Sequence, residues 1–309
     1  MIAGRALGLA LGYAADRAWG DPRRLHPVAG FGACALAMER RTYRDNRASG
    51  MAHVLMLVGG AVGLAYAAEL CARTLWARTA LTAAVTWAVL GGRSLEREAD
   101  AVHAFLAAGD LDSARARVRN LVGRDTTALE PDEIARAVVE SVAENTSDAV
   151  VASLAWGAMA GVPGLVAHRC ANTLDAMIGH RNARYVRFGW AAARLDDLMG
   201  LPPARLSGVL AAALGSDPAG ALRAWHRDSR RHPSPNAGVV EASFAGALGL
   251  QLGGVNTYYG NRREDRARLG CGRAPAPSDI PRTTRLARRV GVGALLTAVT
   301  WCLVSGTKR

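Results

Sequence analysis

Long apolar runs separated by polar stretches dominate the hydropathy pattern of the chain. A helix that crosses the hydrocarbon core of a bilayer needs about 20 mainly apolar residues, or about 17 when it is short or tilted. Runs that reach or approach this length are 53–71, 148–167, 239–255 and 290–305, with shorter ones at 2–15, 79–92 and 206–214. The pattern predicts about four to six membrane-embedded helices. Gly161 and Pro163 predict a kink in the second run.

The polar stretches between these runs are helical in pattern rather than strand-like. Residues 130–133 (EPDE) are typical of a helix start, with proline at an early position and acids in the first turn. Residues 260–285 are rich in Gly, Pro and Arg and predict a loop, and no convincing hairpin signal is present. The expected fold class is all-α, a multi-pass integral membrane helical bundle with polar helical loops on the cytoplasmic side. We expect a single domain over 1–309, with a polar helical insertion at about 94–147.

The amino-acid composition supports a membrane protein but leaves a soluble helical protein as an alternative. The 309 residues are 50% hydrophobic, mostly Ala, Leu, Val and Gly, and small residues let membrane helices approach closely. A soluble all-helical protein with an Ala-rich core is the alternative, but several runs exceed the usual length of a core helix. Residues 1–16 have the look of a signal peptide with a single basic residue, Arg5, and we interpret them as a retained first helix.

The net charge of +12 is carried almost entirely by arginine, since Lys308 is the only lysine. This excludes a Walker loop and a catalytic Schiff-base lysine. Phosphate would have to be held by arginine, backbone amides, histidine or a metal. The arginines lie between apolar runs with few aromatics, which favours positive loops on the cytoplasmic side over nucleic-acid binding. The five cysteines are scattered, which indicates inert thiols rather than a zinc site.

Two groups of carboxylates are candidates for metal chemistry. Glu140, Glu144 and Asp148 are spaced by four, so on a helix they share one face, and carboxylate oxygens suit Mg²⁺. The alternative is a solvated acidic face that caps a helix. Asp196 and Asp197 are adjacent and would bridge a divalent cation bound to phosphate, or else form a helix-end cluster with neighbouring arginines.

Two further polar groups lie beside apolar runs. Arg169, Asn172 and Asp175 fall near one helical stripe directly after an apolar run, and such a stripe should line a cavity or the membrane interface. The segment 232–241 (HPSPNAGVVE) forms a rigid loop that opens a helix, where free amides make a natural anion site. Glu241 lies just inside an apolar run, which makes it a functional candidate.

Taken together, these motifs resemble the CobD/CbiB family of cobalamin biosynthesis, the adenosylcobinamide-phosphate synthases. The resemblance covers essentially the whole chain in family order: GDP…HPV with Asp21 and His26, GRDT at 123–126, AENTSD at 143–148, NTLDAMIG at 172–179, ARLDD at 193–197, HPSPNAG…EA at 232–242, and Tyr259–Gly260.

The resemblance implies a multi-pass protein of the inner membrane with an active site that faces the cytoplasm. It implies a carbon–nitrogen ligase that uses ATP and Mg²⁺ to join aminopropanol, or its O-phosphate, to a propionate of adenosylcobyric acid. The product would be adenosylcobinamide or its phosphate. The implied partners are these substrates and the lipid bilayer, and nucleic acid is not among them. The resemblance is also compatible with a homo-oligomer or with a complex with other late enzymes of the pathway.

Charge and position, read with the resemblance, assign candidate roles. The candidate catalytic residues are Glu144, Asp148, Asp175 and Asp197. The candidate substrate- and phosphate-binding residues are Asp21, His26, Arg124, Asn145, Arg169, Asn172, Arg194, Arg205, His232, Ser234, Asn236 and Glu241. The candidate metal ligands are Glu140, Glu144, Asp148, Asp175, Asp196 and Asp197. The sequence leaves open which carboxylate binds metal and which acts as a base.

Two other function classes compete with the synthase. AmpE-type membrane proteins are distant relatives described as signalling or accessory components, and we expect them to lack the full NTLD and SPNAG set. A transporter would place charges in the middle of membrane spans, whereas most charges here lie at their ends, with Glu69 and Glu241 as exceptions.

Overall fold

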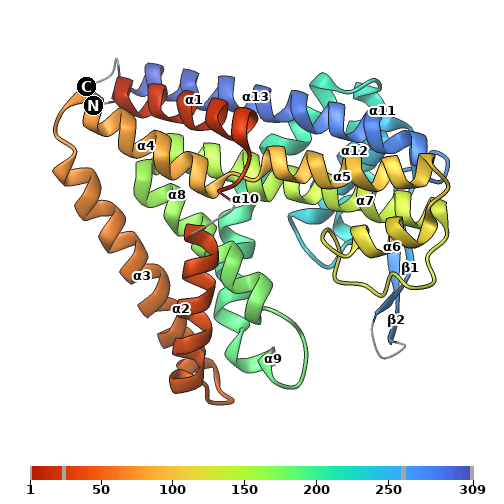
Figure 1. The fold of residues 1–309 in the computed structure, drawn as a ribbon, viewed down its shortest axis with the longest axis horizontal. Helices are drawn as coiled ribbons and strands as arrows, with labels where there is room; N and C mark the ends of the chain where they lie inside the picture. Colours follow the sequence, from red (N-terminus) through yellow and green to blue (C-terminus); the bar gives the residue numbers. More distant parts are fainter. Residues whose placement is uncertain (1, 23–25, 259–261, 307–309) are drawn as a thin grey trace. The chain divides into compact units, whose positions relative to one another are not determined.

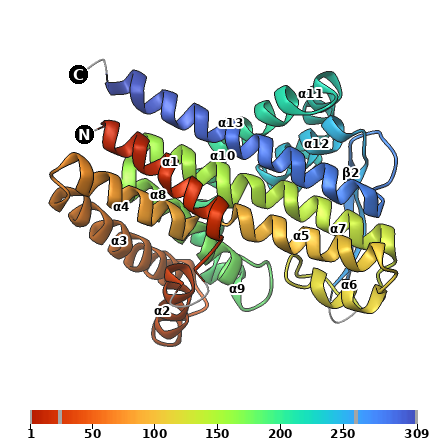
Figure 2. The ribbon, with the colours of Figure 1, turned by 45° about the horizontal axis from the view of Figure 1, so that its top comes forward.

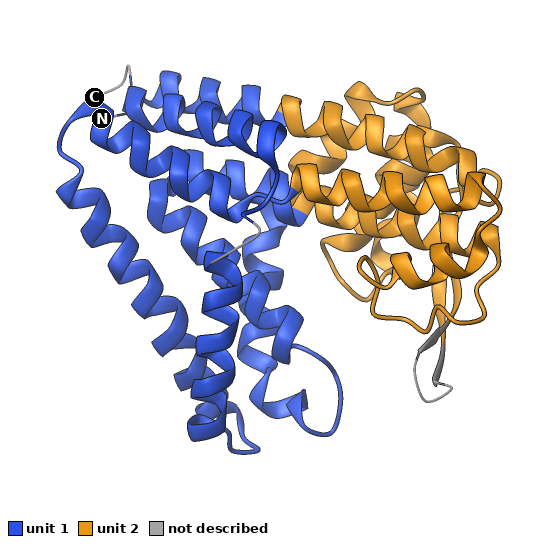
Figure 3. Cartoon of the chain, viewed as in Figure 1, with its two compact units in different colours: residues 1–91, 148–202, 294–309 blue, residues 92–147, 203–293 orange. Residues whose placement is uncertain are grey.

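The computed structural model describes residues 2–22, 26–258 and 262–306 (Figure 1). Over these residues the chain is mostly helical, as predicted, with one short antiparallel hairpin. It divides into two compact units (Figure 3). Unit 1 comprises residues 1–91, 148–202 and 294–309, and unit 2 comprises residues 92–147 and 203–293. The polar insertion predicted at about 94–147 therefore belongs to unit 2, together with a later segment of the chain.

Unit 1 is built from helices alone in its described part. They are α1 (Ile2–Trp19), α2 (Pro27–Thr42), α3 (Arg47–Cys71), α4 (Leu75–Val89), most of the π-helix η1 (Thr146–Val151), α8 (Ala152–Ile178), α9 (Tyr185–Phe188), the first half of α10 (Trp190–Leu214) and the second half of α13 (Ile280–Gly306).

Helices α1 and α4 lie side by side in both views (Figures 1 and 2). A side chain at Gly8 would collide with Thr82, and one at Gly12 would collide with Thr86. The two glycines therefore let the helix backbones approach closely, as small residues do in membrane proteins.

Helix α8 is broken in its middle, where the sequence predicts a kink. Gly161 has a φ of 69°, and Pro163 follows it without an N–H to donate. Just before the break, the carbonyl oxygen of Ala158 accepts a hydrogen bond from Arg5 Nη1 at 3.2 Å. Arg5 also forms an ion pair with Glu69 at 3.4 Å. Three helices of unit 1 thus meet at the kink.

Three helical stretches in the described residues are long and apolar enough to cross a membrane: Arg47–Cys71, Pro131–Ile178 and Pro277–Gly306. They contain the predicted runs 53–71, 148–167 and 290–305. The prediction for 239–255 is wrong, because α12 (Ala237–Leu248) has only 12 residues and ends at Gly249, whose φ is 68°. A multi-pass bundle with cytoplasmic loops stays a prediction.

Unit 2 combines shorter helices with the hairpin. Its elements are α5 (Gly92–Ala107), α6 (Leu111–Val118), α7 (Pro131–Asn145), the second half of α10, α11 (Pro218–Asp228), the 3₁₀ turn η2 (Ser229–Arg231), α12, β1 (Leu252–Tyr258), β2 (Arg262–Leu269), the 3₁₀ turn η3 (Pro277–Asp279) and the first half of α13. The predicted helix start is confirmed, because Pro131 is the first residue of α7 and the Glu130 N–H donates to Glu133 Oε2 at 2.9 Å.

The hairpin corrects two predictions, that strands are absent and that 260–285 is a loop. Strands β1 and β2 pair antiparallel, with Asn256 opposite Glu264, and 260–285 also contains η3 and the start of α13. The prediction failed because β2 reads RREDRARL, so no alternation of apolar and polar residues marks it. The Tyr259–Gly260 part of the family motif lies outside the described residues.

Candidate functional site

The residues predicted for the site fall into two clusters, one in each unit. The unit 1 cluster consists of Asp21, Asp148, Arg169, Asn172, Asp175, Arg194, Asp196 and Asp197. The unit 2 cluster consists of Arg124, Glu140, Glu144, Asn145, Arg205, His232, Ser234, Asn236 and Glu241.

Arg169 is the central cation of the unit 1 cluster. It lies on α8, and the negative charges of Asp21 and Asp148 act on its guanidinium. Its Nε atom is buried and has no hydrogen-bond partner among the described residues. Because nearly all buried donors in proteins are satisfied, an unpaired guanidinium N–H points to a partner such as water or a bound anion.

Arg169 also lines a small cavity of about 90 Å³ between α2, α4 and α8. The other lining residues are Pro27, Val28, Phe31, Val89, Val166, Cys170 and Thr173. The cavity is smaller than the roughly 300–1,000 Å³ of typical ligand pockets. Its surface is almost wholly apolar, so Arg169 contributes mainly the aliphatic part of its side chain to the wall.

Asp175 on α8 and Asp197 on α10 form an acidic pair in which the charge of Asp197 acts on the Asp175 carboxylate. Burial raises the pKa of Asp197 above its usual range, although the guanidiniums of Arg194 and Arg181 oppose the shift. Arg194 Nη1 lies 3.6 Å from Asp197 Oδ2. A carboxylate with a raised pKa is a better proton acceptor near neutral pH than an ordinary aspartate.

Gly179 explains part of the NTLDAMIG motif. It ends α8, and its N–H donates to the carbonyl oxygen of Asp175 at 2.7 Å. A side chain at position 179 would occupy the space that the Asp175 carboxylate fills. Glycine here therefore leaves room for the acidic side chain one turn earlier.

The unit 1 cluster offers carboxylate ligands for the predicted Mg²⁺ but not a complete set of protein ligands. Among the described residues, no three His, Cys, Asp or Glu side chains converge closely enough to hold a metal ion. Mg²⁺ is usually held by one or two carboxylates, with substrate phosphates and waters completing the octahedron. Asp175 and Asp197, with Asp196 beside them, fit that arrangement.

The predicted acidic stripe of Glu140, Glu144 and Asp148 crosses from one helix type to another. Helix α7 ends at Asn145, and Asp148 lies in the π-helix η1 that follows. The charges of Glu140 and Glu144 act on Glu241, whereas the charge of Asp148 acts on Arg169. A shared metal site for all three carboxylates stays a prediction.

His26, predicted to bind substrate, caps a helix in the structure. It precedes α2, and its Nδ1 accepts a hydrogen bond from the Val28 N–H at 3.2 Å. Asn172 lies on α8 three residues from both Arg169 and Asp175, as the predicted stripe requires.

Arg124 holds the GRDT loop of unit 2 in place. It is almost fully buried. Its Nη2 donates to Glu140 Oε2 at 2.8 Å, and its Nη1 donates to Asn256 Oδ1. The other carboxylate oxygen of Glu140 accepts the Gly253 N–H at 2.9 Å. Arg124 and Glu140 thus join a loop, helix α7 and strand β1, and their roles in phosphate and metal binding stay predictions.

Arg136, one turn before Glu140 on α7, strengthens the same connection. Its Nη1 donates to the Gly253 carbonyl oxygen and its Nη2 to that of Val255 at 3.0 Å. The sequence interpretation missed Arg136 and Asn256. The signal for Arg136 was its spacing of four from Glu140, and the signal for Asn256 was a polar residue that follows two glycines after an apolar run.

The SPNAG segment opens α12 as predicted. Ser234 Oγ accepts the N–H groups of Asn236 at 3.3 Å and of Ala237 at 3.2 Å. Arg205 Nη1 donates to Asn236 Oδ1 at 2.9 Å. Two of the amides that were expected to bind an anion are therefore used by the serine cap.

Glu241 and His232 are buried together beside this segment. The Ser234 N–H donates to His232 Nδ1 at 3.0 Å, and His232 Nε2 lies 3.6 Å from Glu241 Oε1. Burial lowers the pKa of His232. Burial raises the pKa of Glu241 well above its usual range, and the charges of Glu140 and Glu144 add to the shift. The pair is thus able to hold a proton inside unit 2.

Comparison with known proteins covers almost the whole chain. The sequence model of a family described as "CobD/Cbib protein" matches residues 9–287. A cobalamin biosynthesis protein CobD of Mycobacterium tuberculosis is 49% identical over 301 residues, which is 96% of this chain and 95% of the relative. Proteins of the same name from Chromobacterium violaceum and Rhodobacter capsulatus are 44% and 39% identical and cover 92% and 97% of this chain, with equal shares of their own length. No solved structure matches the chain.

Proposed function

The chain belongs to the CobD/CbiB family of cobalamin biosynthesis proteins, and on this premise we propose that it is an adenosylcobinamide-phosphate synthase. The proposed reaction joins the amine of aminopropanol O-phosphate to a propionate carboxylate of adenosylcobyric acid, with ATP as the source of free energy. The observation that carries the proposal is the unit 1 cluster, in which the buried Nε of Arg169 has no partner in the described part of the chain and the charge of Asp197 acts on Asp175.

Amide formation from a carboxylate requires that the carboxylate first be activated. In the proposed sequence, a propionate oxygen attacks the γ-phosphorus of ATP and ADP leaves, which gives an acyl phosphate. The amine then attacks the acyl carbon, the C–N bond forms and inorganic phosphate leaves. The amine must lose protons in this step, so the site needs a base as well as cations that stabilise phosphate.

The residues of the unit 1 cluster match these needs. Arg169 is the proposed phosphate ligand, because its buried Nε has no hydrogen-bond partner among the described residues and a phosphate oxygen would supply one. Asp197 is the proposed base for the attacking amine, because burial raises its pKa. Asp175, beside Asp197, is the proposed carboxylate ligand of Mg²⁺, which when bound would neutralise charge on the transferring phosphate.

The three long apolar helices make the chain membrane-like, and we place it in the inner membrane. The excess of arginine between the apolar runs supports an active site on the cytoplasmic side, where both ATP and the corrinoid are present. The NTLD and SPNAG motifs are both intact, which supports an enzyme rather than an AmpE-type accessory protein.

The test is a synthase assay on the full chain purified in detergent. The protein is incubated with adenosylcobyric acid, aminopropanol O-phosphate and Mg-ATP, and the condensed corrinoid is sought by mass spectrometry. We expect product only when ATP is present. A parallel reaction with aminopropanol lacking the phosphate shows which amine is used. Absence of product with both amines, while an authentic synthase works in the same buffer, would overturn the proposal.

A further inference from the structure

A second polar hollow lies in unit 2, apart from the residues of both clusters. It encloses about 190 Å³ between the end of α10, the end of α12 and the start of α13. Three arginines and three leucines form most of its wall: Arg282, Arg285, Arg289, Leu214, Leu248 and Leu286. No acidic side chain lines it. The wall thus combines concentrated positive charge with an apolar floor.

Arg282 is held in place by its own contacts. Its Nη1 donates to Asp279 Oδ1 at 2.6 Å, and its Nη2 donates to the carbonyl oxygen of Leu248 at 3.1 Å. Asp279 is fully buried and also accepts two hydrogen bonds from Arg273, at 2.6 and 2.8 Å. One carboxylate thus serves two arginines, so it neutralises Arg282 only in part.

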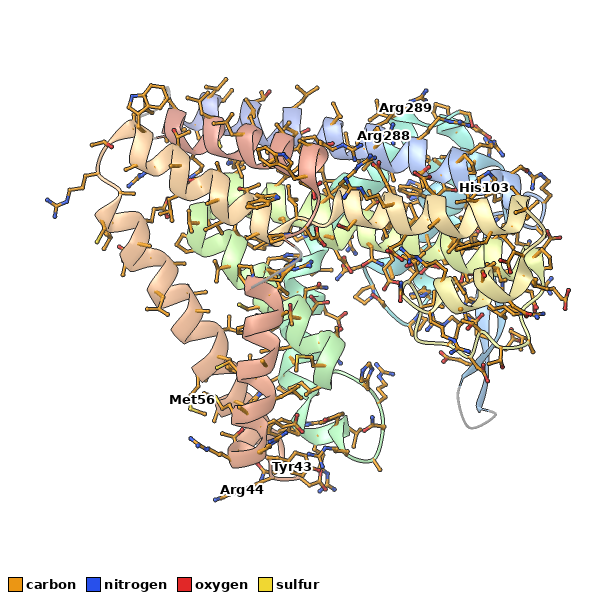
Figure 4. All side chains as sticks on the ribbon, viewed as in Figure 1. Tyr43, Arg44, Met56, His103, Arg288 and Arg289 are labelled. Atoms are coloured by element: carbon orange, nitrogen blue, oxygen red, sulfur yellow. The ribbon has the colours of Figure 1, made fainter. Side chains whose placement is uncertain are left out.

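Arg285 and Arg289 carry charge that no acid in the described part of the chain neutralises by an ion pair. Arg289 Nη1 donates only to the carbonyl oxygen of Leu214, at 3.3 Å. The neighbouring Arg288, which Figure 4 labels beside Arg289, differs because its Nη2 lies 2.8 Å from Glu96 Oε2. Arg285 and Arg289 are thus the two arginines of the hollow whose charge is not offset by an ion pair within the described residues.

We propose that this arginine hollow binds the phosphate group of an anionic ligand. Arginine forks match phosphate oxygens and bind them with paired, charge-assisted hydrogen bonds. The leucines would contact an apolar part of the same ligand. The sequence favours a phospholipid headgroup as the source, because Arg289 is followed by 290–306, which holds no charged residue and ends a stretch apolar enough to cross a membrane. Arginines next to such a run lie at the level of lipid phosphates.

The first arm of the test measures lipid binding to the full chain. Protein purified in a neutral detergent is titrated with phosphatidylglycerol or phosphatidylcholine, and bound lipid is counted by native mass spectrometry. We expect phosphatidylglycerol to bind more tightly. The Arg285→Ala/Arg289→Ala variant should weaken that binding about 10–30-fold, because each arginine near an anionic lipid contributes on the order of a fivefold effect. The matched control, Arg268→Ala, removes an exposed arginine of β2 and should change nothing.

The second arm replaces lipid by soluble anions. Inorganic phosphate and ATP are titrated into the same proteins by calorimetry. If lipid binding depends on Arg285 and Arg289, the ligand of the hollow is a lipid headgroup. If only the binding of phosphate or ATP depends on them, the ligand is a free phosphate compound. Either result supports the hollow as a phosphate site. Equal binding by the wild type and the double variant in both arms would overturn the proposal.

Single substitutions protect the test against misfolding. Arg285 and Arg289 are both exposed, so Arg285→Gln and Arg289→Gln should fold normally. Each should weaken the anion binding about fivefold. If neither does, the proposal fails even when the double variant is unstable. Because the readout is binding, the outcome is independent of whether the chain has synthase activity.

Discussion

The two clusters use the same residue types in opposite ways. In unit 2, the guanidinium of Arg124 and both oxygens of Glu140 are bonded to protein groups that join a loop, a helix and a strand. In unit 1, Arg169 keeps a buried Nε without a partner in the described residues, and Asp175 has a second acid as its charged neighbour. Saturated charges hold a fold together, whereas charges that are left unsaturated suit a ligand.

The largest expected effect is on activity, from the acidic pair of unit 1. Asp175→Asn and Asp197→Asn should each lower the synthase rate about 10²–10⁴-fold, because a base or a metal ligand is lost. The rate is measured with saturating Mg-ATP on purified variants. Asp45→Asn, which removes an exposed carboxylate of the same unit, is the matched control and should keep the wild-type rate. Rates within twofold of wild type for both variants would remove the pair from the site.

A large effect on stability is expected from the saturated cluster. Arg124→Ala leaves the buried Glu140 carboxylate without its cation, which should destabilise the protein by about 3–5 kcal/mol. Chemical denaturation in detergent gives the free energy of unfolding, and the exposed Arg230→Ala is the control. The Arg124→Met/Glu140→Leu variant should recover part of the loss, because it removes both charges together. Loss of less than about 1 kcal/mol in Arg124→Ala would mean that the contact does not hold unit 2.

Gly179→Ala tests whether the acidic pair needs its present geometry. The new methyl group must push the Asp175 carboxylate aside. We expect a rate about tenfold lower, together with a stability loss of about 1–3 kcal/mol from overpacking. Gly59→Ala on α3 is the control, because its new methyl group would meet no atom within 4 Å. An unchanged rate in Gly179→Ala would show that the position of Asp175 is not critical.

The smallest expected effect is the pH dependence that Glu241 gives to stability. Burial in the folded state raises its pKa well above the ordinary 4.5, so above that pH the unfolded chain releases a proton that the folded chain keeps. Glu241 therefore makes stability fall as pH rises, until the pH passes the folded pKa. Glutamine does not titrate, so the Tm of Glu241→Gln should rise relative to the Tm of the wild type as the pH increases above 4.5. Asp265→Asn, an exposed acid on β2, should show no such gain, and a constant Tm difference for Glu241→Gln would contradict the assignment.

Features that depend on a few neighbouring residues could be predicted from the sequence. The kink of α8 follows from Gly161 and Pro163, which break helical hydrogen bonds locally. The start of α7 follows from proline and the acids of its first turn. The stripe of Arg169, Asn172 and Asp175 was predicted because α8 is a regular helix there.

Features that depend on distant contacts could not be predicted in this way. The partner of Arg124 is Asn256, 132 residues further along the chain, in a hairpin that hydropathy did not reveal. The π-helix that follows α7 and contains Asp148 was not predicted either, because no composition signal marks such a turn. The short α12 was misread because burial inside a protein and burial in lipid select the same apolar residues.

The contact of Arg5 with the kink of α8 has a consequence for how the protein is assembled. Arg5 is made first, Glu69 follows 64 residues later, and Ala158 is made 153 residues after Arg5. Until α8 is in place, Arg5 lacks one of its two partners. A generic membrane anchor of equal length in place of α1 would preserve insertion but would remove the donor that Arg5 supplies at the kink. The first helix is therefore a late-acting part of the fold, although it is the first to leave the ribosome.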